Sequence, residues 1–327
     1  MTGNWFITGG CGFIGRNLIL RLLKEGKGIR VFDNLSVCGL KELAAIAEIE
    51  VSQGEMDACR PGVIQLVEGD IRDESVLAAA LKGMDIVVHL AANTGVPRSV
   101  ADPAMDFSAN TLGTFLLLEQ ARLAHIKRFI FASSGAPTGN ATPPITEDAV
   151  ARPVSPYGAS KLAGEGYCSA YFHCFGLETV ALRFSNVYGP FSRHKKSVVA
   201  KFVNAALAGE VWTIFGDGRQ TRDFLYVADL VDAIWRAAMT PGIGGEIFQI
   251  STGVEHTLLE LTHALQEVMS LQGVNTGAIS FGDIRTGDIV RNYADPSKAE
   301  RMMGWKAVTA LSDGLRLTVD WFIGMHN

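Results

Sequence analysis

A tyrosine and a lysine stand four residues apart in the segment Ser155-Pro-Tyr-Gly-Ala-Ser-Lys161. Proline is tolerated in the first turn of a helix, so Pro156 predicts a helix that begins near it, and residues i and i+4 of a helix share one face. A free phenol titrates near pH 10, roughly, but an ammonium group beside it favours the phenolate. Tyr157 could then act as a general base at neutral pH, with Lys161 as its cationic partner. The alternative is a solvated pair on a helix surface.

Two hydroxyls end the strand predicted to begin at Arg128. Ser133 and Ser134 would lie at the carboxyl edge of a parallel sheet, where open α/β sheets place their ligands. A hydroxyl there could hydrogen-bond the substrate oxygen from which Tyr157 removes a proton, which makes Ser134 a candidate catalytic residue. The alternative is a pair of ordinary serines at the end of a strand.

A glycine pattern near the N-terminus indicates a phosphate ligand. Gly9, Gly12 and Gly15 follow the apolar run Trp5–Ile7 and precede a stretch with helical spacing. In such a turn the first glycine permits the tight bend, the second lets the backbone approach a pyrophosphate, and the third lets helix and strand pack closely. The pyrophosphate then lies on the free N–H groups at the start of the helix. A plain turn is the alternative.

Acidic residues after the next two strands fit a dinucleotide. Asp33 closes the second strand at the distance expected for a ribose-binding acid, and its carboxylate would accept both ribose hydroxyls but repel a 2′-phosphate. NAD is therefore favoured over NADP, although Asp33 and Asn34 could simply form a turn. Asp70 follows the third strand, where it could reach the adenine amino group or lie in a surface turn.

Short apolar runs alternate with amphipathic stretches through the first half of the chain. Such alternation predicts right-handed βαβ crossovers and a parallel sheet, hence the α/β class with a doubly wound sheet. Residues 38–62 are expected to be an irregular insertion with a surface helix and loop. Strands are predicted at 5–7, 29–32, 63–67, 85–90, 128–131, 178–182, 211–215, 224–226 and 246–250, and helices at 14–24, 74–82, 107–125, 158–175, 197–208, 229–238, 256–270, 297–303 and 309–324.

Composition and charge exclude several classes of protein. The chain has 327 residues, 48% hydrophobic and 19% charged, with a net charge of −5. This balance supports a sizeable core and argues against disorder and against nucleic acid as a partner. The five cysteines form no C-x-x-C pair, so neither a disulfide framework nor a structural zinc site is expected, and no metal site is predicted. Because no apolar run is long enough to span a bilayer, we expect no membrane insertion and a cytoplasmic location.

Together these residues resemble the extended short-chain dehydrogenase/reductases, and within them the NAD-dependent epimerase/dehydratase family acting on nucleotide sugars, such as the UDP-glucose and UDP-N-acetylglucosamine 4-epimerases. The likeness covers nearly the whole chain and is also carried by His89–Ala92, Asn110, Arg183–Pro190, Gly216–Gly218, Arg222–Phe224, Arg285–Asp288 and Tyr293–Lys298. It implies a Rossmann-like NAD-binding domain over 1–184, to which 218–250 returns. A smaller, mixed α/β domain over 185–217 and 251–327 would bind the nucleotide sugar.

The family pattern implies a role for each matching position. The catalytic residues would be Ser134, Tyr157 and Lys161. Asn186, Arg222 and Arg285 would contact the pyrophosphate or nucleotide, for which guanidinium groups are suited because they bind phosphate oxygens bidentately. The set implied for NAD is Gly9, Gly12, Phe13, Ile14, Gly15, Asp33, Asn34, Asp70, Ile71, Leu90, Ala91, Ala92, Asn110, Tyr157 and Lys161, and the set implied for a UDP-sugar is Val96, Ser134, Asn186, Arg222, Arg285 and Asn292.

The residues after the strand-end serine bear on the reaction. Family members share a first step, in which the tyrosine removes the proton of the sugar 4-hydroxyl while C4 gives hydride to NAD. Dehydratases then use acids in a Thr-Asp-Glu pattern, and decarboxylases use a glutamate two residues after the threonine. This chain has Ser134-Gly-Ala136, without a carboxylate, and so resembles C4 epimerases, whose 4-keto sugar turns over and takes the hydride back. A dehydratase or reductase is the alternative, and a non-catalytic NAD-binding regulatory protein is the alternative of another class.

Several features bear on the substrate. Asn292 matches a position at which epimerases that exclude N-acetyl sugars carry a bulky aromatic residue. Because this chain has an asparagine there, the resemblance implies tolerance of N-acetylated hexoses. Val96–Ser99 resembles the loop that approaches the sugar in the UDP-N-acetylglucosamine branch. The basic run Arg193–Lys196 is typical of a solvated loop, or could recognise an acidic group such as a uronate carboxylate or the diphosphate. Pro137–Gly139 departs from the family's Val-Tyr-Gly, which alters that loop.

Two predicted helices bear on assembly. The helices near 107–125 and 155–175 are apolar on more than one face, and a helix that is apolar all round must be covered. Relatives commonly pair through these two helices, so the resemblance implies a homodimer. The protein's own sheet could instead cover part of this surface.

Overall fold

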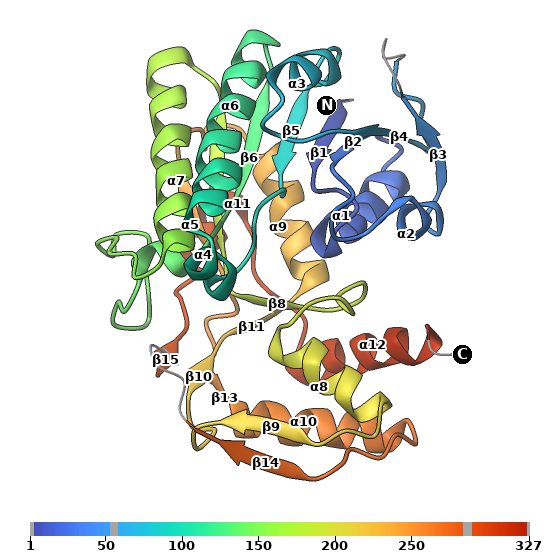
Figure 1. The fold of residues 1–327 in the computed structure, drawn as a ribbon. Coiled ribbons are helices and arrows are strands. Elements are labelled where there is room, and N and C mark those ends of the chain that lie inside the picture. The colour runs from blue at the N-terminus through green and yellow to red at the C-terminus, as the bar shows by residue number, and fades with distance from the viewer. Residues whose placement is uncertain (1–2, 53–57, 284–289, 326–327) are drawn as a thin grey trace.

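The computed structural model describes residues 3–52, 58–283 and 290–325, and its largest element is a parallel sheet (Figure 1). Within these residues the strand order is β12-β7-β6-β5-β1-β2-β4-β3, and every neighbouring pair is parallel. The strands are β1 (Asn4–Thr8), β2 (Gly28–Asp33), β3 (Glu48–Val51), β4 (Val63–Glu68), β5 (Ile86–His89), β6 (Arg128–Ser134), β7 (Thr179–Phe184) and β12 (Ile247–Ile250). This sheet confirms the expected α/β class with Rossmann-like architecture.

Helices cover both faces of the sheet. One face packs against α1 (Phe13–Lys24), α9 (Val227–Met239) and α11 (Ser297–Met303), the other against α3 (Glu74–Ala80), α6 (Gly113–Leu123) and α7 (Pro156–Phe175). Along β1, Trp5 and Ile7 join the first core and Phe6 joins the second, so the strand is buried on both sides. Strands of this kind read as continuous apolar runs, which explains why the sequence revealed them. None of the helices in the described ranges is long and apolar enough to cross a membrane.

The order of the strands places a crevice beside β1. From β1 the chain proceeds through β2 to β4 on one side, whereas β5, β6, β7 and β12 lie on the other side. The loops that leave β1 and β5 therefore diverge, and this reversal point is where open α/β sheets bind their ligands. The glycine turn follows β1 and the Leu90–Thr94 segment follows β5, so both predicted cofactor segments border the crevice.

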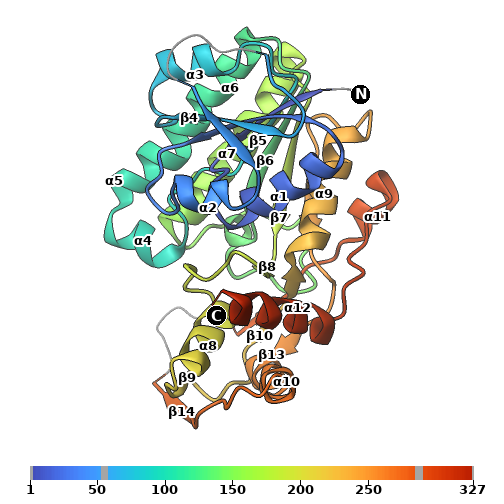
Figure 2. The ribbon, with the colours of Figure 1, turned by 90° about the vertical axis from the view of Figure 1, so that its right-hand side faces the viewer.

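A second core lies beyond the carboxyl edge of the sheet (Figure 2). It is built from α8 (Val198–Leu207), β9 (Trp212–Phe215), β14 (Ile279–Gly282), α10 (Leu258–Leu271) and α12 (Leu311–Gly324). Phe202 of α8 and Trp212 of β9 stack with their ring centroids 4.8 Å apart. Short strands connect the two cores: β8 (Asn186–Tyr188) pairs with β11 (Phe224–Tyr226), and β10 (Thr221–Arg222) lies between β13 (His256–Thr257) and β15 (Arg291–Asn292).

Two segments differ from the sequence expectation. Within residues 38–62 the expected surface helix is α2 (Leu40–Ala44), but the segment also contains β3, which was not expected and pairs with β4 at the edge of the sheet. No side chain of β3 is buried, so this strand lacks the apolar run that marks the others. The single helix expected at 107–125 begins as a π-helical turn, Phe107–Leu112, and α4 (Val96–Ala101) and α5 (Pro103–Asp106) precede it.

Candidate active site

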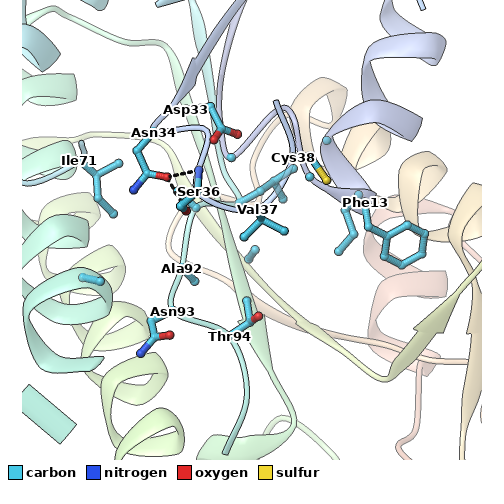
Figure 3. A pocket seen from close by; sticks show the side chains of 18 of the residues that line it. Phe13, Asp33, Asn34, Ser36, Val37, Cys38, Ile71, Ala92, Asn93 and Thr94 are labelled. Atoms are coloured by element: carbon cyan, nitrogen blue, oxygen red, sulfur yellow. Dashed lines mark hydrogen bonds between the residues drawn. The ribbon is translucent and has the colours of Figure 1, made fainter. Parts of the chain in front are cut away.

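A cleft of about 430 Å³ opens at the carboxyl edge of the sheet, where the loops after β1 and β5 diverge. Its walls come from the glycine turn, the ends of β2 and β4, the loop after β5 and the first turns of α7. Figure 3 shows side chains of the Asp33–Cys38 and Ala92–Thr94 loops bordering it. The sequence-predicted residues that line it are Gly9, Gly12, Phe13, Ile14, Gly15, Asp33, Asn34, Asp70, Ile71, Leu90, Ala91, Ala92, Tyr157 and Lys161.

The glycine turn leaves no room for a side chain at Gly9 or Gly15. Gly9 has a φ of +68°, and a Cβ there would lie 2.8 Å from the Ala91 nitrogen. A Cβ on Gly15 would lie 2.5 Å from Gly10, so α1 can pack on the turn only because this residue is glycine. Gly12 is the N-cap of α1 and supplies no side-chain hydrogen bond, which leaves the first N–H groups of the helix for a ligand. These features fit a dinucleotide pyrophosphate.

Alanine substitutions of two of these glycines should distinguish a role in packing from a role in ligand binding. We expect Gly15→Ala to destabilise the protein by about 1–3 kcal/mol, because its methyl group overpacks the turn. Gly12→Ala should leave the melting temperature almost unchanged, since its Cβ meets only the Gly9 carbonyl oxygen, at 3.2 Å. Because Gly12 lines the cleft, its variant should bind NAD at least about tenfold more weakly, a loss of roughly 1.4 kcal/mol. Thermal unfolding measures the stability of both variants, and NAD titration measures their affinity. A destabilised Gly12→Ala protein, together with a Gly15→Ala protein that loses only NAD affinity, would contradict this assignment.

Asp33 lies at the end of β2, where its carboxylate orders the neighbouring loops. One oxygen accepts the Cys11 N–H at 3.0 Å and the other accepts the Leu35 N–H at 2.9 Å. Burial raises the pKa of this carboxyl above its usual range, and these hydrogen bonds partly oppose the rise. Asn34 accepts hydrogen bonds from the N–H and the hydroxyl of Ser36. Asp33 thus links the second strand to the glycine turn on the wall predicted to bind ribose.

Asp70 forms a fixed pair with Arg72 at the rim of the cleft. Arg72 donates from Nε at 2.8 Å and from Nη2 at 2.7 Å to the two carboxylate oxygens. These hydrogen bonds lower the pKa of Asp70 to about 2, so the carboxylate stays ionised. Arg72 and Ile71 line the cleft beside it. Contact between Asp70 and an adenine remains a prediction, and Arg72 is a wall residue that the sequence did not single out.

A buried, neutral histidine fixes the loop after β5. The Nδ1 of His89 lies 2.7 Å from the Thr8 hydroxyl, and its Nε2 lies 3.0 Å from the Thr114 hydroxyl. Since the Thr114 hydroxyl donates to the Asn110 carbonyl, it accepts from Nε2–H, which assigns the Nε2-protonated tautomer. The Thr8 hydroxyl accepts the Ala91 N–H at 3.2 Å. Burial lowers the pKa of His89 to about 3, and this neutral chain ties Ala91 to α6.

Asn110 supports the cleft wall from behind. Its side-chain oxygen accepts the Asn93 N–H at 2.7 Å, and its amide group donates to the Asn93 carbonyl at 3.0 Å and to Asp106 at 2.8 Å. Asn93 lines the cleft, whereas Asn110 is buried in the π-helical turn. Any effect of Asn110 on NAD binding would therefore pass through the backbone of Asn93.

The helix that carries the tyrosine and lysine begins where the sequence predicts. Ser155 caps α7 by accepting the Gly158 N–H at 3.1 Å, and Pro156 occupies the first turn. The cap fixes the start of the helix at the cleft. Tyr157 and Lys161 consequently share the face that lines the cleft.

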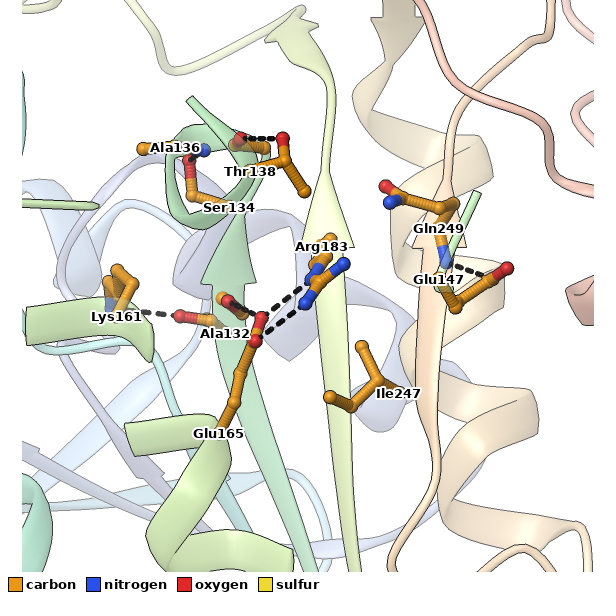
Figure 4. A network of polar contacts seen from close by, with 12 residues as sticks. Ala132, Ser134, Ala136, Thr138, Glu147, Lys161, Glu165, Arg183, Ile247 and Gln249 are labelled. Atoms are coloured by element: carbon orange, nitrogen blue, oxygen red, sulfur yellow. Dashed lines mark hydrogen bonds and ion pairs between the residues drawn. The ribbon is translucent and has the colours of Figure 1, made fainter. Parts of the chain in front are cut away.

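Tyr157 and Lys161 line the cleft, and Ser134 lies beside Tyr157. The Ser134 side chain is near enough to the Tyr157 hydroxyl to act on the pKa of the phenol. The Lys161 ammonium lies 5.9 Å from the centre of the Tyr157 ring and donates to the Ala132 carbonyl at 2.8 Å (Figure 4). The predicted catalytic residues, which come from β6 and α7, are thus brought together around one phenol.

Burial governs the protonation of this group in the chain alone. It raises the pKa of Tyr157 to about 12, although the hydrogen bond with Ser134 acts in the opposite direction. It lowers the pKa of Lys161 to about 8. In the chain alone Lys161 does not lower the pKa of the phenol to neutral values, because Lys161 donates to the Ala132 carbonyl and burial dominates. The expected lowering by the lysine together with a cationic nicotinamide stays a prediction. A cationic ligand group beside the phenol would favour the phenolate.

A buried ion pair that the sequence did not single out lies behind these residues. Glu165 accepts Nε and Nη2 of Arg183, each at 2.8 Å, and also the Ser133 hydroxyl (Figure 4). Both charged side chains are at most 4% exposed. The network joins α7 to β6 and β7 next to Ser134, so it holds the strand end against the helix. Glu165 stands four residues after Lys161 on the same helix face, a spacing that could have revealed it.

Residues implied for the substrate gather around a buried aspartate. Asn186 donates from its backbone and side chain to the Asp223 carbonyl, at 3.0 and 3.2 Å. Arg222 of β10 and Asn292 of β15 face each other in register. The Asp223 side chain is fully buried and accepts the Thr252 N–H at 3.0 Å, which ties these strands to the end of β12. The sequence revealed Asp223 only as part of the Arg222–Phe224 motif.

Two further substrate candidates are Val96 and Arg285. Val96 is exposed at the start of α4, and Arg285 lies outside the described residues. Within the basic run, His194 and Lys195 line the cleft, so the run is more than a solvated loop.

Comparison with known proteins places these features in a family context. A family model described as the NAD dependent epimerase/dehydratase family matches residues 5–251. A UDP-glucose 4-epimerase of Mycolicibacterium smegmatis is 37% identical over 322 residues, which are 97% of each chain. A UDP-glucose 4-epimerase of Thermotoga maritima, solved with UDP-glucose, has a TM-score of 0.88 at 33% identity and covers 99% of this chain and 100% of its own. A UDP-N-acetylglucosamine 4-epimerase of Methanobrevibacter ruminantium, solved with UDP-N-acetylmuramic acid, has a TM-score of 0.87 at 30% identity over 99% of both chains.

Proposed function

Because this chain belongs to the NAD-dependent epimerase/dehydratase family, we propose that it binds NAD and inverts the configuration at C4 of a nucleotide hexose, with UDP-hexoses as the substrate class. The observation that carries the proposal is that Tyr157 and Lys161 line the cleft beside Ser134, with no carboxylate at Gly135 or Ala136. The relatives reported above, named UDP-glucose and UDP-N-acetylglucosamine 4-epimerases, support it.

The described residues fit NAD along the length of the cleft. The glycine turn and the N-terminus of α1 would hold its pyrophosphate, Asp33 its adenosine ribose, and Tyr157 and Lys161 its nicotinamide ribose. When bound, NAD would supply a hydride acceptor and donor at its nicotinamide ring. We propose that it is retained through each turnover as a prosthetic group, because the reaction regenerates it.

Tyr157 acts as the general base and acid of the proposed reaction. Its phenolate would take the proton of the sugar 4-hydroxyl as C4 loses hydride, and the phenol would return that proton after the 4-keto sugar has turned over. Ser134 would hydrogen-bond the same sugar oxygen and Lys161 would stabilise the phenolate by its charge. Proton and hydride both return to the sugar, so no net redox change results.

A dehydratase on this scaffold needs further acid and base groups. Glu165 lies on the same helix face as Lys161, but its carboxylate oxygens are engaged by Arg183 and Ser133 and the side chain is buried. It therefore does not replace the acids that dehydratases carry after the strand-end residue. A reductase would consume reduced cofactor continuously. A non-catalytic NAD-binding regulatory protein would have no need for the Ser134 and Tyr157 contact or for Lys161.

The proposal is tested with the purified protein and no added cofactor. We expect bound nicotinamide in the released ligand fraction and interconversion of a UDP-hexose and its C4 epimer, followed by NMR. Loss of one water from the sugar would indicate a dehydratase, and steady consumption of added reduced cofactor would indicate a reductase. Absence of turnover on a panel of nucleotide sugars, with NAD bound, would favour the regulatory alternative.

Asn292 is proposed to leave space for an N-acetyl group. It lies on β15 in register with Arg222, and it is smaller than an aromatic residue. Asn292→Tyr should therefore lower kcat/KM for UDP-N-acetylglucosamine by about 10²-fold, because hydrophobic and steric discrimination by one group is of this size, and leave UDP-glucose turnover within a fewfold. Asn292→Ser is the matched small control and should retain both activities. Equal kinetics of the tyrosine variant on both sugars would refute this role.

We propose the domain division 1–184 with 218–250, and 185–217 with 251–327. Support comes from β12 and α9, which join the large sheet, and from the separate core of α8, α10 and α12. α11 also packs on the large sheet, so the second part returns to it once.

Homodimerisation through α6 and α7 is proposed because Leu123, Tyr167 and Phe175 are 39–56% exposed there. A cytoplasmic location is proposed because the five cysteines are unpaired.

A further inference from the structure

Residues 189–197, here named the strap, reach the cleft at His194 and Lys195 and are anchored on α1. Asn17 donates to the Pro190 carbonyl and Arg16 to the Phe191 carbonyl, each at 3.1 Å. The Arg16 guanidinium also lies 4.7 Å from the centre of the Phe191 ring. Phe191 has a φ of 67°, a conformation that a bulky residue adopts only when its surroundings impose it. The strap is therefore held at the helix whose N-terminus faces the cleft.

Farther along, the strap brings basic side chains to the cleft. The Nδ1 of His194 lies 3.6 Å from the sulfur of Cys38, which stands on the wall formed by the loop after β2. Lys195 follows and lines the cleft, and Arg98 of α4 lines it from the side of the loop after β5. Burial, and then the positive charge of Arg98, lower the pKa of Lys195 below its usual range. Two cations from opposite walls thus face a common space.

These two cations have no acidic partner within the described parts of the chain. Arg72 in the same cleft is paired with Asp70, and Arg183 behind it is paired with Glu165. No carboxylate forms such a pair with Arg98 or Lys195 among the residues that the structure describes. Like charges held near each other without a counter-ion repel, and an anion between them reverses the sign of the interaction. The pair therefore has the electrostatics of a binding site for an oxyanion.

We propose that Arg98 and Lys195 form an oxyanion site that grips the diphosphate of a bound nucleotide and thereby fastens the strap to α4. The proposal rests on the proposed function in one respect, namely that both ligands of the cleft, NAD and the nucleotide sugar, carry a diphosphate. A guanidinium group binds two phosphate oxygens at once, and a lysine adds a point charge from the other side. Ligand binding would then close the cleft mouth by joining two walls that the free chain leaves apart.

The test is a set of binding measurements that need no turnover. Arg98→Gln, Lys195→Gln and the double variant are titrated with NAD in the cofactor-free protein, and with UDP in the NAD-loaded protein. The matched control is Lys196→Gln, since Lys196 is the next residue of the strap, carries the same charge and is exposed. Each single variant should bind the diphosphate ligand about tenfold more weakly, as for the loss of one charged hydrogen bond, and the control should stay within about twofold. The loss should shrink at high salt.

Comparison of NAD binding with UDP binding identifies which ligand's diphosphate the site holds. Weaker NAD binding with unchanged UDP binding assigns the site to the cofactor, and the reverse assigns it to the substrate. Unchanged affinity for both ligands in the double variant, at the wild-type melting temperature, would overturn the proposal. A loss confined to a UDP-uronate, with UDP and the neutral UDP-hexose unaffected, would also overturn it in favour of carboxylate recognition. Failure of the wild-type protein to epimerise any UDP-hexose would contradict the proposed function and leave these binding results standing.

Discussion

Tyr157→Phe is expected to lower kcat by about 10²- to 10⁴-fold, the range that a general acid–base group contributes. The variant removes only the hydroxyl beside Ser134, whereas the ring and its packing near Lys161 remain. NAD binding should therefore stay within a fewfold of the wild-type value. The measurement is the rate of UDP-hexose interconversion by the NAD-loaded variant, together with its content of bound nicotinamide.

Tyr167→Phe is the matched control for this experiment. Tyr167 lies on the same helix, but it is 39% exposed, packs against Phe115 with tilted rings and is not among the residues that line the cleft. Its variant should retain full activity. A Tyr157→Phe protein that keeps NAD and also keeps its rate would show that another group handles the proton of the 4-hydroxyl.

Lys161→Met should abolish most activity and change how stability depends on pH. Burial lowers the pKa of this lysine to about 8, from an ordinary value of 10.5, so the folded chain holds the proton less tightly than the unfolded chain. Below pH 8 both states are protonated and the fold carries the full penalty of a buried ammonium group. Between pH 8 and 10.5 the folded state alone loses its proton, so wild-type stability should rise with pH across this window. The methionine variant lacks this rise.

Thermal unfolding of the two cofactor-free proteins at several pH values measures the difference. We expect the melting temperature of the variant, relative to that of the wild type, to be highest at neutral pH and lowest near pH 10.5. The variant also loses the hydrogen bond to the Ala132 carbonyl at every pH. Comparing the slopes rather than the absolute temperatures removes that constant loss. Parallel curves would mean that Lys161 is not a destabilising buried charge. A buried ammonium group that lowers the free energy of unfolding is consistent with an active site that is less stable in order to be active.

Local patterns made much of the fold predictable. The glycine turn, the cap at Ser155 and the apolar runs of β1 and β5 each depend on a few neighbouring residues, so the sequence shows them directly. Edge strand β3 was missed because none of its side chains is buried and its residues carry no apolar run. The short helices before α6 were missed because Pro97 and Pro103 interrupt the helical periodicity that would have marked them.

The parts of the site that depend on distant partners could not be predicted. Asp223 is a buried carboxylate because strands and loops that lie far apart in the chain converge on it. The contact of Cys38 with His194 joins residues 156 positions apart, so no local pattern predicts it. The pKa of Tyr157 likewise follows from burial rather than from the adjacent lysine. The spacing of residues in the sequence predicts which side chains lie together, whereas burial and long-range contacts determine the protonation states of those side chains.

The central claim is that the hydrogen removed from C4 returns to the same carbon. A UDP-hexose carrying deuterium at C4 is incubated with the NAD-loaded protein in ordinary water, and both epimers are analysed by NMR and mass spectrometry. In the proposed reaction the C4 epimer forms with its deuterium still at C4. Deuterium appearing at C6 of a dehydrated sugar, or lost to solvent, would contradict it.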